Sequence, residues 1–476
     1  MAQELFPDGI RAVNIGVAEF ALPPRAHGAT VLDLDWRPPA EADPALGLLV
    51  ARLEDDAEGE IGGQVAVANR AAVARILEAR PVLTAIRTAA EVLPGLGART
   101  ILHAGPPIAW ARMCGPMRGA AVGAILYEGW AASAEAATLL CEQGEIAFAP
   151  CHHYGAVGPM AGILSPSMPV AVVENAGAGN RAFATLNEGL GKVLRFGAYG
   201  SEVLERLRWM AETLAPALGA ALAAHGPVDL KALTAQALLM GDECHNRNVA
   251  STSLFTRLIA PALVRTAPTA VAARILEFLE GNNHFYLNLS MAACKAALDA
   301  AHDIPHSTVV TAMARNGVEV GIRMSGTGAA WFTAPALVPQ GLFFPGYGPD
   351  DANPDLGDSA ITETMGIGAF AMAAAPAIAR FIGGSPEDGL RYTREMYGIT
   401  LARNGDFGIP ALGFTGTPTA IDARRVVDSG VTPVINTGVA HREAGIGQIG
   451  AGVIRAPLAC FTQALSALGR QSGLVP

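Results

Sequence analysis

Charged side chains are scarce in this sequence of 476 residues, of which only 16% are Asp, Glu, Lys or Arg. The formal net charge is −10, and there is no long basic run of the kind that binds a phosphodiester backbone, which argues against a nucleic-acid partner. The apolar run Gly366–Ala379 is shorter than a bilayer span and contains Pro376, so it predicts a buried helix and not a membrane helix. The N-terminal residues lack the apolar core of a secretory signal, and we expect a cytoplasmic protein.

Recognisable metal and cofactor motifs are also missing. The six cysteines have no CxxC spacing, which excludes a zinc ribbon and argues against a disulfide scaffold. His302 and His306 are four residues apart, but Pro305 interrupts the helix that would align them as metal ligands. The "GIGQIG" of Gly445–Gly450 resembles a dinucleotide-binding turn, yet strand-like sequence follows where a helix is required. Walker A, GxSxG and HExxH motifs are absent, so we expect no metal and no cofactor.

The length predicts several domains, and the 51% hydrophobic content with 54 Gly and 32 Pro predicts good packing with many turns. Strand-like and helical patterns are mixed, which indicates a multi-domain α/β or α+β fold with a central helical subdomain and a strand-rich C-terminal part. We expect an N-terminal α/β domain over residues 1–143, an α/β segment over 144–200 that packs with the C-terminal part, a helical subdomain over 201–304 that carries polar motifs, and a C-terminal α/β domain over 305–476.

Several elements are specific enough to be checked. Strands are expected at 11–20, 29–36, 318–325, 432–441 and 448–455. Helices are expected over 67–93 with a break or kink at Pro81, over 119–141, and over 361–381 as one long helix.

The most unusual string is "GDECHNRN", Gly241–Asn248, because it concentrates polar side chains between two apolar stretches. If its neighbours extend a helix through it, Glu243 and Arg247 meet one turn apart, and His245 shares a face with Asn248. Buried charges need partners, so we favour a helix between lobes or a break that opens into a cleft. An exposed helix end or a salt-bridged loop is the alternative.

A second polar string, "EGNNHFYLNLSMAACKAAL", begins a helix whose apolar residues repeat every three or four positions. Asn282 or Asn283 is a natural N-cap, and His284 falls in the first turn. The free N–H groups of a helix start can bind an anion. Capping without a ligand explains the same residues equally well.

The strand-like "VEVGIRMSGTG" places Arg323 and Ser325 on the face opposite its apolar residues. A guanidinium beside the free amides of "SGTG" suits a carboxylate or phosphate, whereas a salt bridge to Glu319 is the competing explanation. The string "DANPDLGDSAITETMG" contains the acid Glu363, but helix capping by Asp358 explains most of it. In "CHHYG", adjacent histidines on a strand face opposite ways, so only one serves a site, and we count His152 as a candidate.

The family resemblance rests on "MGDECHNRN", "EGNNHFYLNLSMAACKA", "RNGVEVGIRMSG", "WFTAPA" and "DANPDLGDSAITETMGIGAFAMAAAPAIA". With these strings the sequence resembles the YlbE-like family over roughly residues 10 to 470. The resemblance implies a multi-domain α+β fold with a small helical subdomain. It also implies a subunit of oxamate carbamoyltransferase, which works beside an FdrA-like chain and another subunit. That enzyme moves a carbamoyl group between oxalurate and phosphate, with oxamate and carbamoyl phosphate as the products. The resemblance assigns no catalytic residues.

The residues themselves suggest roles in such chemistry, which needs anion donors, a cradle for the ureido group and a proton carrier. We expect His245, Glu243 and His284 to be catalytic, with Glu243 orienting a histidine. We expect the substrate-binding residues to be Asn246, Arg247, Asn248, Asn283, Arg323, Ser325 and His152. The strings Asp242–Asn248, Asn282–His284 and Arg323–Ser325 are expected to meet in one cleft. The chain is further expected to form a homo-oligomer. An amidohydrolase or decarboxylase acting on a related ureido acid, and a non-catalytic scaffold subunit, remain alternatives.

Overall fold

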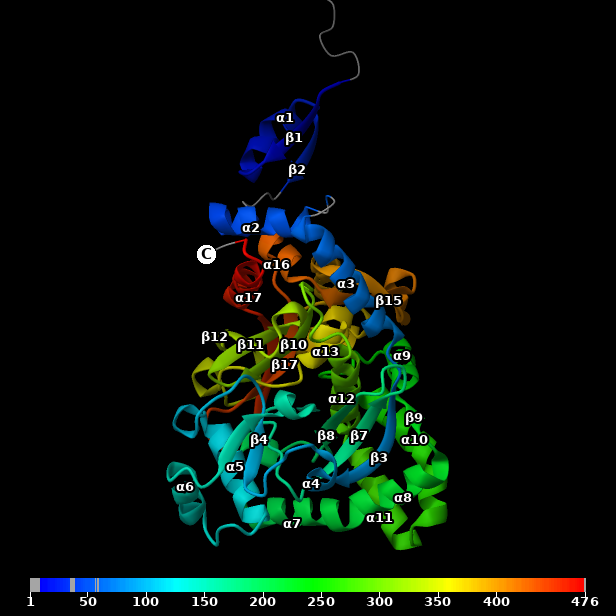
Figure 1. Cartoon of the computed structure of the whole chain (residues 1–476). Coiled ribbons are helices and arrows are strands. Elements are labelled where there is room, and N and C mark those ends of the chain that lie inside the picture. Colours follow the sequence, from blue (N-terminus) through cyan, green and yellow to red (C-terminus); the bar gives the residue numbers. More distant parts are fainter. Residues whose placement is uncertain (1–8, 35–38, 56, 58–59, 475–476) are drawn as a thin grey trace, which may run out of the picture.

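The structure is a computed structural model that describes residues 9–34, 39–55, 57 and 60–474. The N-terminal residues form a small βαβ lobe, in which α1 (Leu22–Ala26) joins the parallel strands β1 (Arg11–Ile15) and β2 (Thr30–Leu34). Figure 1 shows this lobe apart from the body of the molecule. Strand β2 confirms the strand predicted at 29–36, of which residues 35 and 36 lie outside the described part of the chain. The strand predicted at 11–20 is only partly correct, because β1 ends at Ile15 and Ala18–Ala21 form a 3-10 helix.

A mixed five-stranded sheet forms one half of the body. Its strands, in the spatial order β6-β8-β7-β3-β9, are β6 (Ala156–Val157), β8 (Arg181–Thr185), β7 (Pro169–Asn175), β3 (Pro81–Thr88) and β9 (Val228–Asp229). The short parallel pair β4 (Thr100–His103) and β5 (Ala147–Pro150) lies beside helices α5 (Gly115–Tyr127) and α6 (Ala134–Glu142).

Two helix predictions in this half need correction. The helix expected over 67–93 ends with α3 (Ile61–Glu78), and Pro81 begins strand β3, where alternate side chains are buried and exposed as a strand requires. The helix expected over 119–141 is two helices, because α5 ends near Gly129, which adopts a left-handed φ of +70°.

The predicted helical region is present and surrounds one buried helix. It comprises α7 (Ser201–Trp209), α8 (Ala215–His225), α9 (Leu230–Leu239), α10 (Val249–Thr266), α11 (Thr269–Gly281) and α12 (Phe285–Asp299). Every residue of α12 from Phe285 to Leu298 is buried. It packs against β3, β7 and β8 on one side and against α13 (Ile361–Met365) and β10 (Val310–Asn316) on the other. Helix α12 therefore connects the two halves of the body (Figure 1).

The C-terminal part is rich in antiparallel strands. One sheet has the strand order β12 (Phe332–Pro335), β11 (Glu319–Met324), β10 and β14 (Leu356–Gly357). A second sheet has the order β13 (Gln340–Phe343), β18 (Gln448–Arg455) and β17 (Val434–Ala440). Strand β15 (Thr400–Ile409) pairs with β16 (Thr415–Ile421). The remaining longer helices are α2 (Pro44–Glu54), α14 (Pro376–Phe381), α15 (Pro386–Met396), α16 (Ala423–Ser429) and α17 (Leu458–Gln471). The predicted strands β11, β17 and β18 are thus confirmed.

The single long helix expected over 361–381 is wrong. This segment is α13, a 3-10 stretch over Gly368–Ala374, and α14. Gly366 and Gly368 adopt left-handed φ angles of +100° and +61°, which end one helix, and Pro376 begins the next. The break turns Glu363 toward the interior between the two halves, where it is fully buried.

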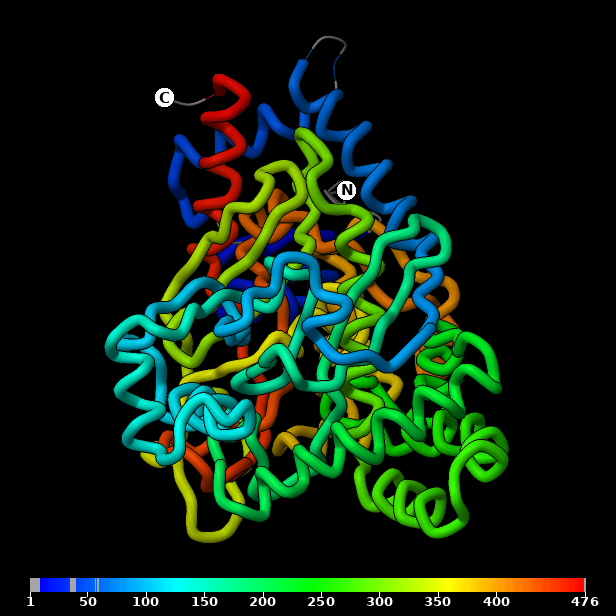
Figure 2. Tube along the Cα trace, turned by 60° about the horizontal axis from the view of Figure 1, so that its bottom comes forward, coloured from blue at the N-terminus to red at the C-terminus, as the bar shows by residue number. Residues whose placement is uncertain are grey.

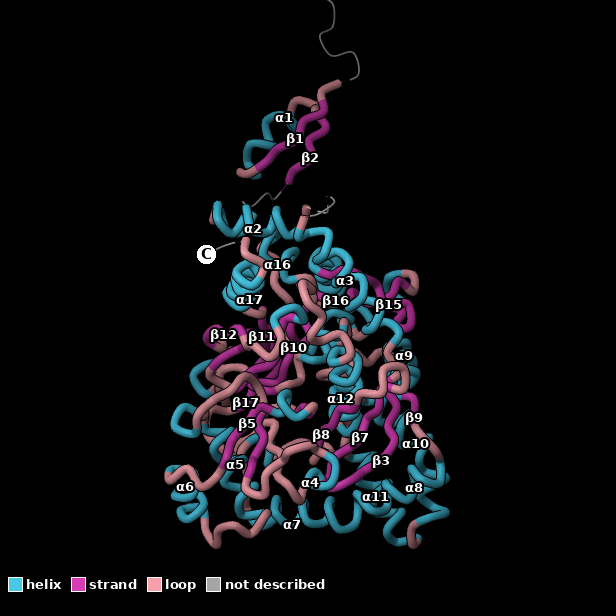
Figure 3. The backbone as a smooth tube through the Cα atoms, in the orientation of Figure 1, coloured by secondary structure: helices cyan, strands magenta, loops and turns pink. Residues whose placement is uncertain are grey.

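The predicted mixed α+β class is confirmed. Figure 3 shows the strands in the middle of the molecule, with α7, α8 and α11 along one edge. The terminal regions pack together, because α17 lies beside α2 in Figures 1 and 2 and both contribute to one apolar core. Within the described residues, no helix combines the length and apolar character needed to cross a bilayer.

Candidate functional site

The polar string Gly241–Asn248 is a loop between α9 and α10. Of the two predicted alternatives, the break is confirmed and the continuous helix is wrong. Gly241 and Cys244 have left-handed φ angles of +93° and +61°, which no helix accommodates. The Glu243 carboxylate holds the loop, since it accepts the backbone N–H groups of His245, Asn246 and Arg247 at 2.9, 2.6 and 2.9 Å. Local carboxylate-to-backbone bonds of this kind compete directly with helical ones.

Glu243 therefore shapes the loop, and a different acid orients the histidine. Both oxygens of Glu363 lie within 3.1 Å of His245 Nδ1, the shorter distance being 2.8 Å. Glu363 is itself fixed by the Ala369 N–H and the Thr362 hydroxyl at 2.9 and 3.0 Å. With Nδ1–H donated to a carboxylate, the lone pair of His245 is on Nε2, the arrangement of a general base.

The loop and the Glu363 segment are bound to each other. The Gly368 N–H donates to the Glu243 carbonyl at 2.8 Å, and the Asn436 side chain donates to Glu243 Oε1 at 3.2 Å. Burial raises the pKa of Glu243 to about 7, against the lowering effect of His245 and the backbone donors. The two glutamates and the imidazole thus form one buried network at the junction of α10, α12 and β17.

A pocket of about 520 Å³ lies next to this network, since Asn246, which follows His245 in the chain, lines it. His245, Glu243 and Glu363 lie behind the lining residues and are not among them. Three segments distant in sequence supply its polar lining, which consists of Asn246, Arg247, Asn248, Asn283, His284 and Gln448. Leu190, Phe344 and Phe381 are among the residues of its apolar wall. Apolar walls with a few convergent polar groups are typical of small-molecule sites.

Several polar atoms of the pocket are buried and have no hydrogen-bond partner among the described residues. They are Asn246 Nδ2, Asn248 Oδ1 and His284 Nδ1. Burial, followed by the charge of Arg195, lowers the pKa of His284 to about 3, so its imidazole is neutral at physiological pH. Unpaired buried polar groups are costly, and a ligand with its own donors and acceptors would satisfy them.

Two details of the site differ from the prediction made from the sequence. The Arg247 guanidinium pairs with Asp242, at 3.4 Å, and not with Glu243. The N-cap of α12 is His284, whose N–H donates to the Asn282 side chain at 3.2 Å, so neither predicted asparagine occupies the cap position itself. Asn283 is exposed in the pocket.

The expectation of a single cleft is wrong, because Arg323 and Ser325 lie elsewhere, as does His152. Ser325 is fully buried and donates to the Ala301 carbonyl at 2.7 Å, a structural contact. Arg323 and His152 lie near the C-terminal end of α12, whereas the pocket is at its N-terminal end. Glu319 pairs with Arg112 at 3.4 Å, so the predicted alternative of a Glu319–Arg323 bridge is also wrong.

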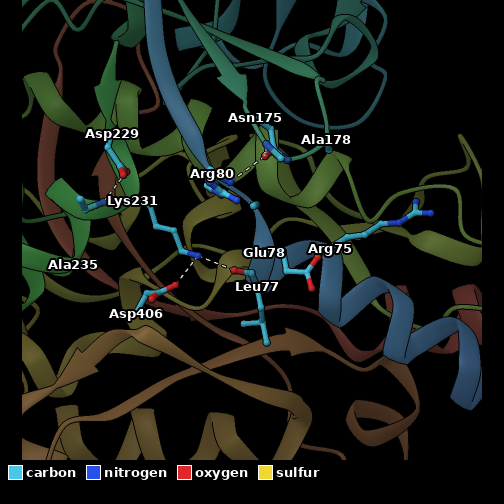
Figure 4. A pocket seen from close by; sticks show the side chains of 13 residues that line it. Arg75, Leu77, Glu78, Arg80, Asn175, Ala178, Asp229, Lys231, Ala235 and Asp406 are labelled. Carbon is cyan, nitrogen blue, oxygen red and sulfur yellow. Dashed lines mark hydrogen bonds and ion pairs between the residues drawn. The ribbon is translucent and has the colours of Figure 1, made fainter. Parts of the chain in front are cut away.

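A larger cavity, of about 680 Å³, lies between α3, α9 and β15 (Figure 4). Its polar groups are mostly satisfied by one another. Lys231 reaches Asp406 at 2.6 Å and the Leu77 carbonyl at 2.7 Å, and the Asn175 side chain accepts the Arg80 N–H (Figure 4). We therefore place the candidate site in the smaller pocket.

Sequence reasoning missed Glu363, Asn436 and Gln448. Glu363 belongs to a polar string that helix capping already explained. Its burial, which only the structure shows, is what distinguishes it. Asn436 and Gln448 lie on strands β17 and β18, where isolated amides give no pattern.

The fold and the site define a mixed α+β protein that holds an imidazole–carboxylate pair beside a pocket for a small polar ligand. A family model described as oxamate carbamoyltransferase subunit AllG matches residues 146–359. The oxamate carbamoyltransferase subunit AllG of Escherichia coli K12 is 53% identical over 414 residues, which cover 86% of this chain and 99% of the relative. The chain therefore belongs to the AllG family, and the resemblance to oxamate carbamoyltransferase subunits is confirmed.

Two further comparisons agree. An uncharacterized protein of E. coli K12, YahG, is 46% identical over 466 residues, or 98% of both chains. The crystal structure of a conserved protein of unknown function from Enterococcus faecalis V583 superposes with a TM-score of 0.85 at 47% identity, covering 86% of this chain and 99% of that one.

Proposed function

We propose that this chain is a subunit of a carbamoyltransferase complex and that its pocket binds a small ureido or amide acid. Membership of the AllG family supports the complex. The observation that carries the pocket assignment is the set of unpaired amide and imidazole atoms beside the buried His245–Glu363 pair. The reaction proposed is oxalurate plus phosphate to oxamate plus carbamoyl phosphate, or its reverse.

The pocket residues match the two ends of such a substrate. Arg247 offers a planar fork to the carboxylate, a match that an ammonium group lacks. Asn246 and Asn283 offer amide donors and acceptors to the ureido group, and the neutral His284 supplies a further hydrogen bond. Leu190 and Phe381 give the pocket an apolar side.

His245 is the proton carrier in this proposal. In the phosphate direction, a phosphate oxygen attacks the carbamoyl carbon, and the bond from that carbon to the oxamate nitrogen breaks. His245 Nε2 takes the proton from the attacking phosphate hydroxyl and returns it to the leaving nitrogen, so no proton is gained or lost. Glu363 is a positioning residue that holds Nδ1–H and stabilises the transient imidazolium.

Other subunits, among them an FdrA-like chain, complete the enzyme in this proposal. The test is reconstitution of the complex, followed by product analysis with and without phosphate. Carbamoyl phosphate formed only when phosphate is present supports transfer, whereas ammonia released without phosphate indicates an amidohydrolase.

The Glu363→Gln variant tests whether this chain does the chemistry. General acid–base groups contribute roughly 10²–10⁴-fold to rate, so we expect kcat to fall by a large part of that factor with little change in KM. The Glu395→Gln variant, which breaks an ion pair with Arg455 outside the pocket, is the control. If the complex assembles and Glu363→Gln turns over at the wild-type rate, this chain is a scaffold.

A further inference from the structure

A second group of buried cationic and imidazole side chains lies at the opposite end of α12 from the pocket. We name it the Lys295–Arg323 cluster and define it by His152, Lys295 and Arg323. These residues come from separate elements, the 3-10 turn Cys151–Tyr154, α12 and β11. From His284 to Lys295 the helix rises about 15 Å, so the cluster is not part of the pocket.

The cluster has more N–H groups than hydrogen-bond acceptors in contact with them. Lys295 is 1% exposed and makes one hydrogen bond, to Asp299 at 2.6 Å, although an ammonium has three N–H groups. The His152 side chain is fully buried, and its Nε2 lies 3.5 Å from Asp358 Oδ1. That contact lacks hydrogen-bond geometry, and neither ring nitrogen has a hydrogen-bond partner among the described residues. Arg323 is 8% exposed, and its Nε–H is likewise without a partner in the described part of the chain.

The Arg323 guanidinium has no carboxylate in direct contact, in contrast to that of the buried Arg315. Burial lowers the pKa of Arg323, and Asp299 and Asp303 partly offset this effect from a greater distance. Arg315 is held by both oxygens of Asp355, at 2.7 and 3.2 Å. Arg323 donates instead to His302 Nε2 at 2.6 Å, and the described residues place no carboxylate oxygen within 4 Å of its guanidinium. Because His302 Nδ1 donates to Thr311 at 2.8 Å, Nε2 is a neutral acceptor that cancels no charge.

Burial of a guanidinium that has no anion in contact costs free energy. The group that would lower this cost is an anion. Water would satisfy the unpaired N–H groups but would leave the charge. A small oxyanion satisfies both, since its oxygens accept from several donors and its charge offsets that of Arg323.

The electrostatics of the neighbouring imidazoles are consistent with this arrangement. Burial and then Arg323 lower the pKa values of His153 and His302 to about 4 each. Burial and then Lys295 lower the pKa of His152. The two cations thus act on the same small volume.

We propose that His152, Lys295 and Arg323 bind a small oxyanion, a phosphate or a carboxylate. Trp331 covers the site, with its ring centre 5.4 Å from the His152 ring and 5.9 Å from Arg323 Cζ. Its Nε1–H donates to His153 Nε2 at 3.0 Å, and His153 is exposed, so the outer edge of the cluster reaches solvent. This site is independent of the proposed carbamoyl transfer, because it needs only binding.

The test is calorimetric titration of inorganic phosphate, and separately of oxamate, into the purified full chain at constant ionic strength. The variants are Arg323→Gln and Lys295→Met in the cluster, with Arg455→Gln, whose ion pair with Glu395 lies outside both sites, as the matched control. Arg247→Gln reports any binding in the pocket. The loss of one charge-assisted contact weakens binding roughly ten- to a hundredfold. We expect that loss in both cluster variants, with phosphate affinity unchanged in Arg455→Gln. A phosphate response that the cluster variants lose identifies phosphate as the ligand of the cluster, and an oxamate response that the cluster variants lose and Arg247→Gln keeps identifies a carboxylate.

Thermal melts separate binding from a structural role. If Arg323 binds an anion, the phosphate-dependent rise in melting temperature disappears in Arg323→Gln, while the variant melts no lower than wild type without phosphate, since a buried charge with no carboxylate in direct contact has been removed. His152→Asn, on a different element, is a second variant if one cluster substitution fails to fold. Phosphate binding that is lost in Arg247→Gln but kept in the cluster variants overturns the proposal, as does the absence of any response to phosphate and oxamate.

Discussion

The two buried glutamates of the site have different roles that depend on what each carboxylate faces. Glu243 faces three backbone N–H groups of its own loop, so its removal would change the path of the chain. Glu363 faces an imidazole nitrogen, so its removal would change the orientation and tautomer of His245. The separation of these roles explains why one polar site needs two fully buried acids.

His284 provides a pH prediction at the residue scale. Its pKa is lowered from 6.5 to about 3 by burial, with Arg195 adding to the effect. The folded pKa lies below the unfolded one, so the stability from neutral His284 is complete above pH 6.5 and is lost as the pH falls through about 3. In NMR spectra of histidine-labelled protein, we expect one imidazole, assigned by its loss in His284→Gln, to show no titration between pH 5 and 8. A midpoint near 6.5 for that signal would contradict the buried environment.

At the scale of elements, the site depends on a helix break. Gly368 has φ of +61°, and a β-carbon there would lie inside van der Waals contact of Glu363 Oε1. A left-handed conformation costs a non-glycine residue about 1–2 kcal/mol. We therefore expect Gly368→Ala to lower the free energy of unfolding by at least about 1 kcal/mol and to displace Glu363 from His245.

The control for this prediction is Gly219→Ala in the middle of α8. A β-carbon at Gly219 meets only the Ile86 carbonyl, at an ordinary 3.7 Å. Alanine in a helix interior is more stable than glycine by roughly 0.5–1 kcal/mol. Urea unfolding of both variants is the measurement, and equal stability of Gly368→Ala and wild type would show that the break tolerates a side chain.

The accuracy of sequence-based prediction also varied by element. Helix α12 was predicted from the spacing of its apolar residues, because that spacing is a local property of the sequence. The sequence left open whether Gly241–Asn248 continues a helix, and it did not predict the break at Gly368. Both segments are fixed in part by contacts between residues more than 100 positions apart, such as Gly368 N–H with the Glu243 carbonyl. Glu363 was missed for the same reason, since its partner His245 lies 118 positions away. The pocket residues Asn246, Arg247 and His284 were found because they stand out locally against apolar sequence.

At the scale of the whole molecule, the N-terminal lobe and the body are expected to contribute differently to the free energy of unfolding. Within the described residues, no hydrogen bond joins the lobe at 9–34 to the rest. Helix α2, which follows, buries Leu49, Val50 and Leu53 in the core that includes α16 and α17. The body is therefore expected to fold without the lobe but not without α2.

Two truncations test this expectation. A chain that lacks residues 1–38 should keep the wild-type midpoint of thermal unfolding. A chain that lacks residues 1–54 also loses three buried side chains, each worth about 1.5–3 kcal/mol, and should melt well below wild type. A large loss in the shorter truncation would mean that the lobe stabilises the body through contacts other than these.

The central claim is that the pocket beside His245 and Glu363 is the ligand site of a carbamoyltransferase subunit. The most direct measurement is a titration of oxalurate into the reconstituted complex, with wild-type chain and with Arg247→Lys, beside a thermal melt of each. Because lysine keeps the charge but lacks the planar fork, we predict unchanged melting and an affinity weaker by roughly ten- to a hundredfold. Unchanged affinity with a sharply lowered melting temperature would contradict the claim, because Arg247 would then be a structural partner of Asp242 and the ligand would bind elsewhere.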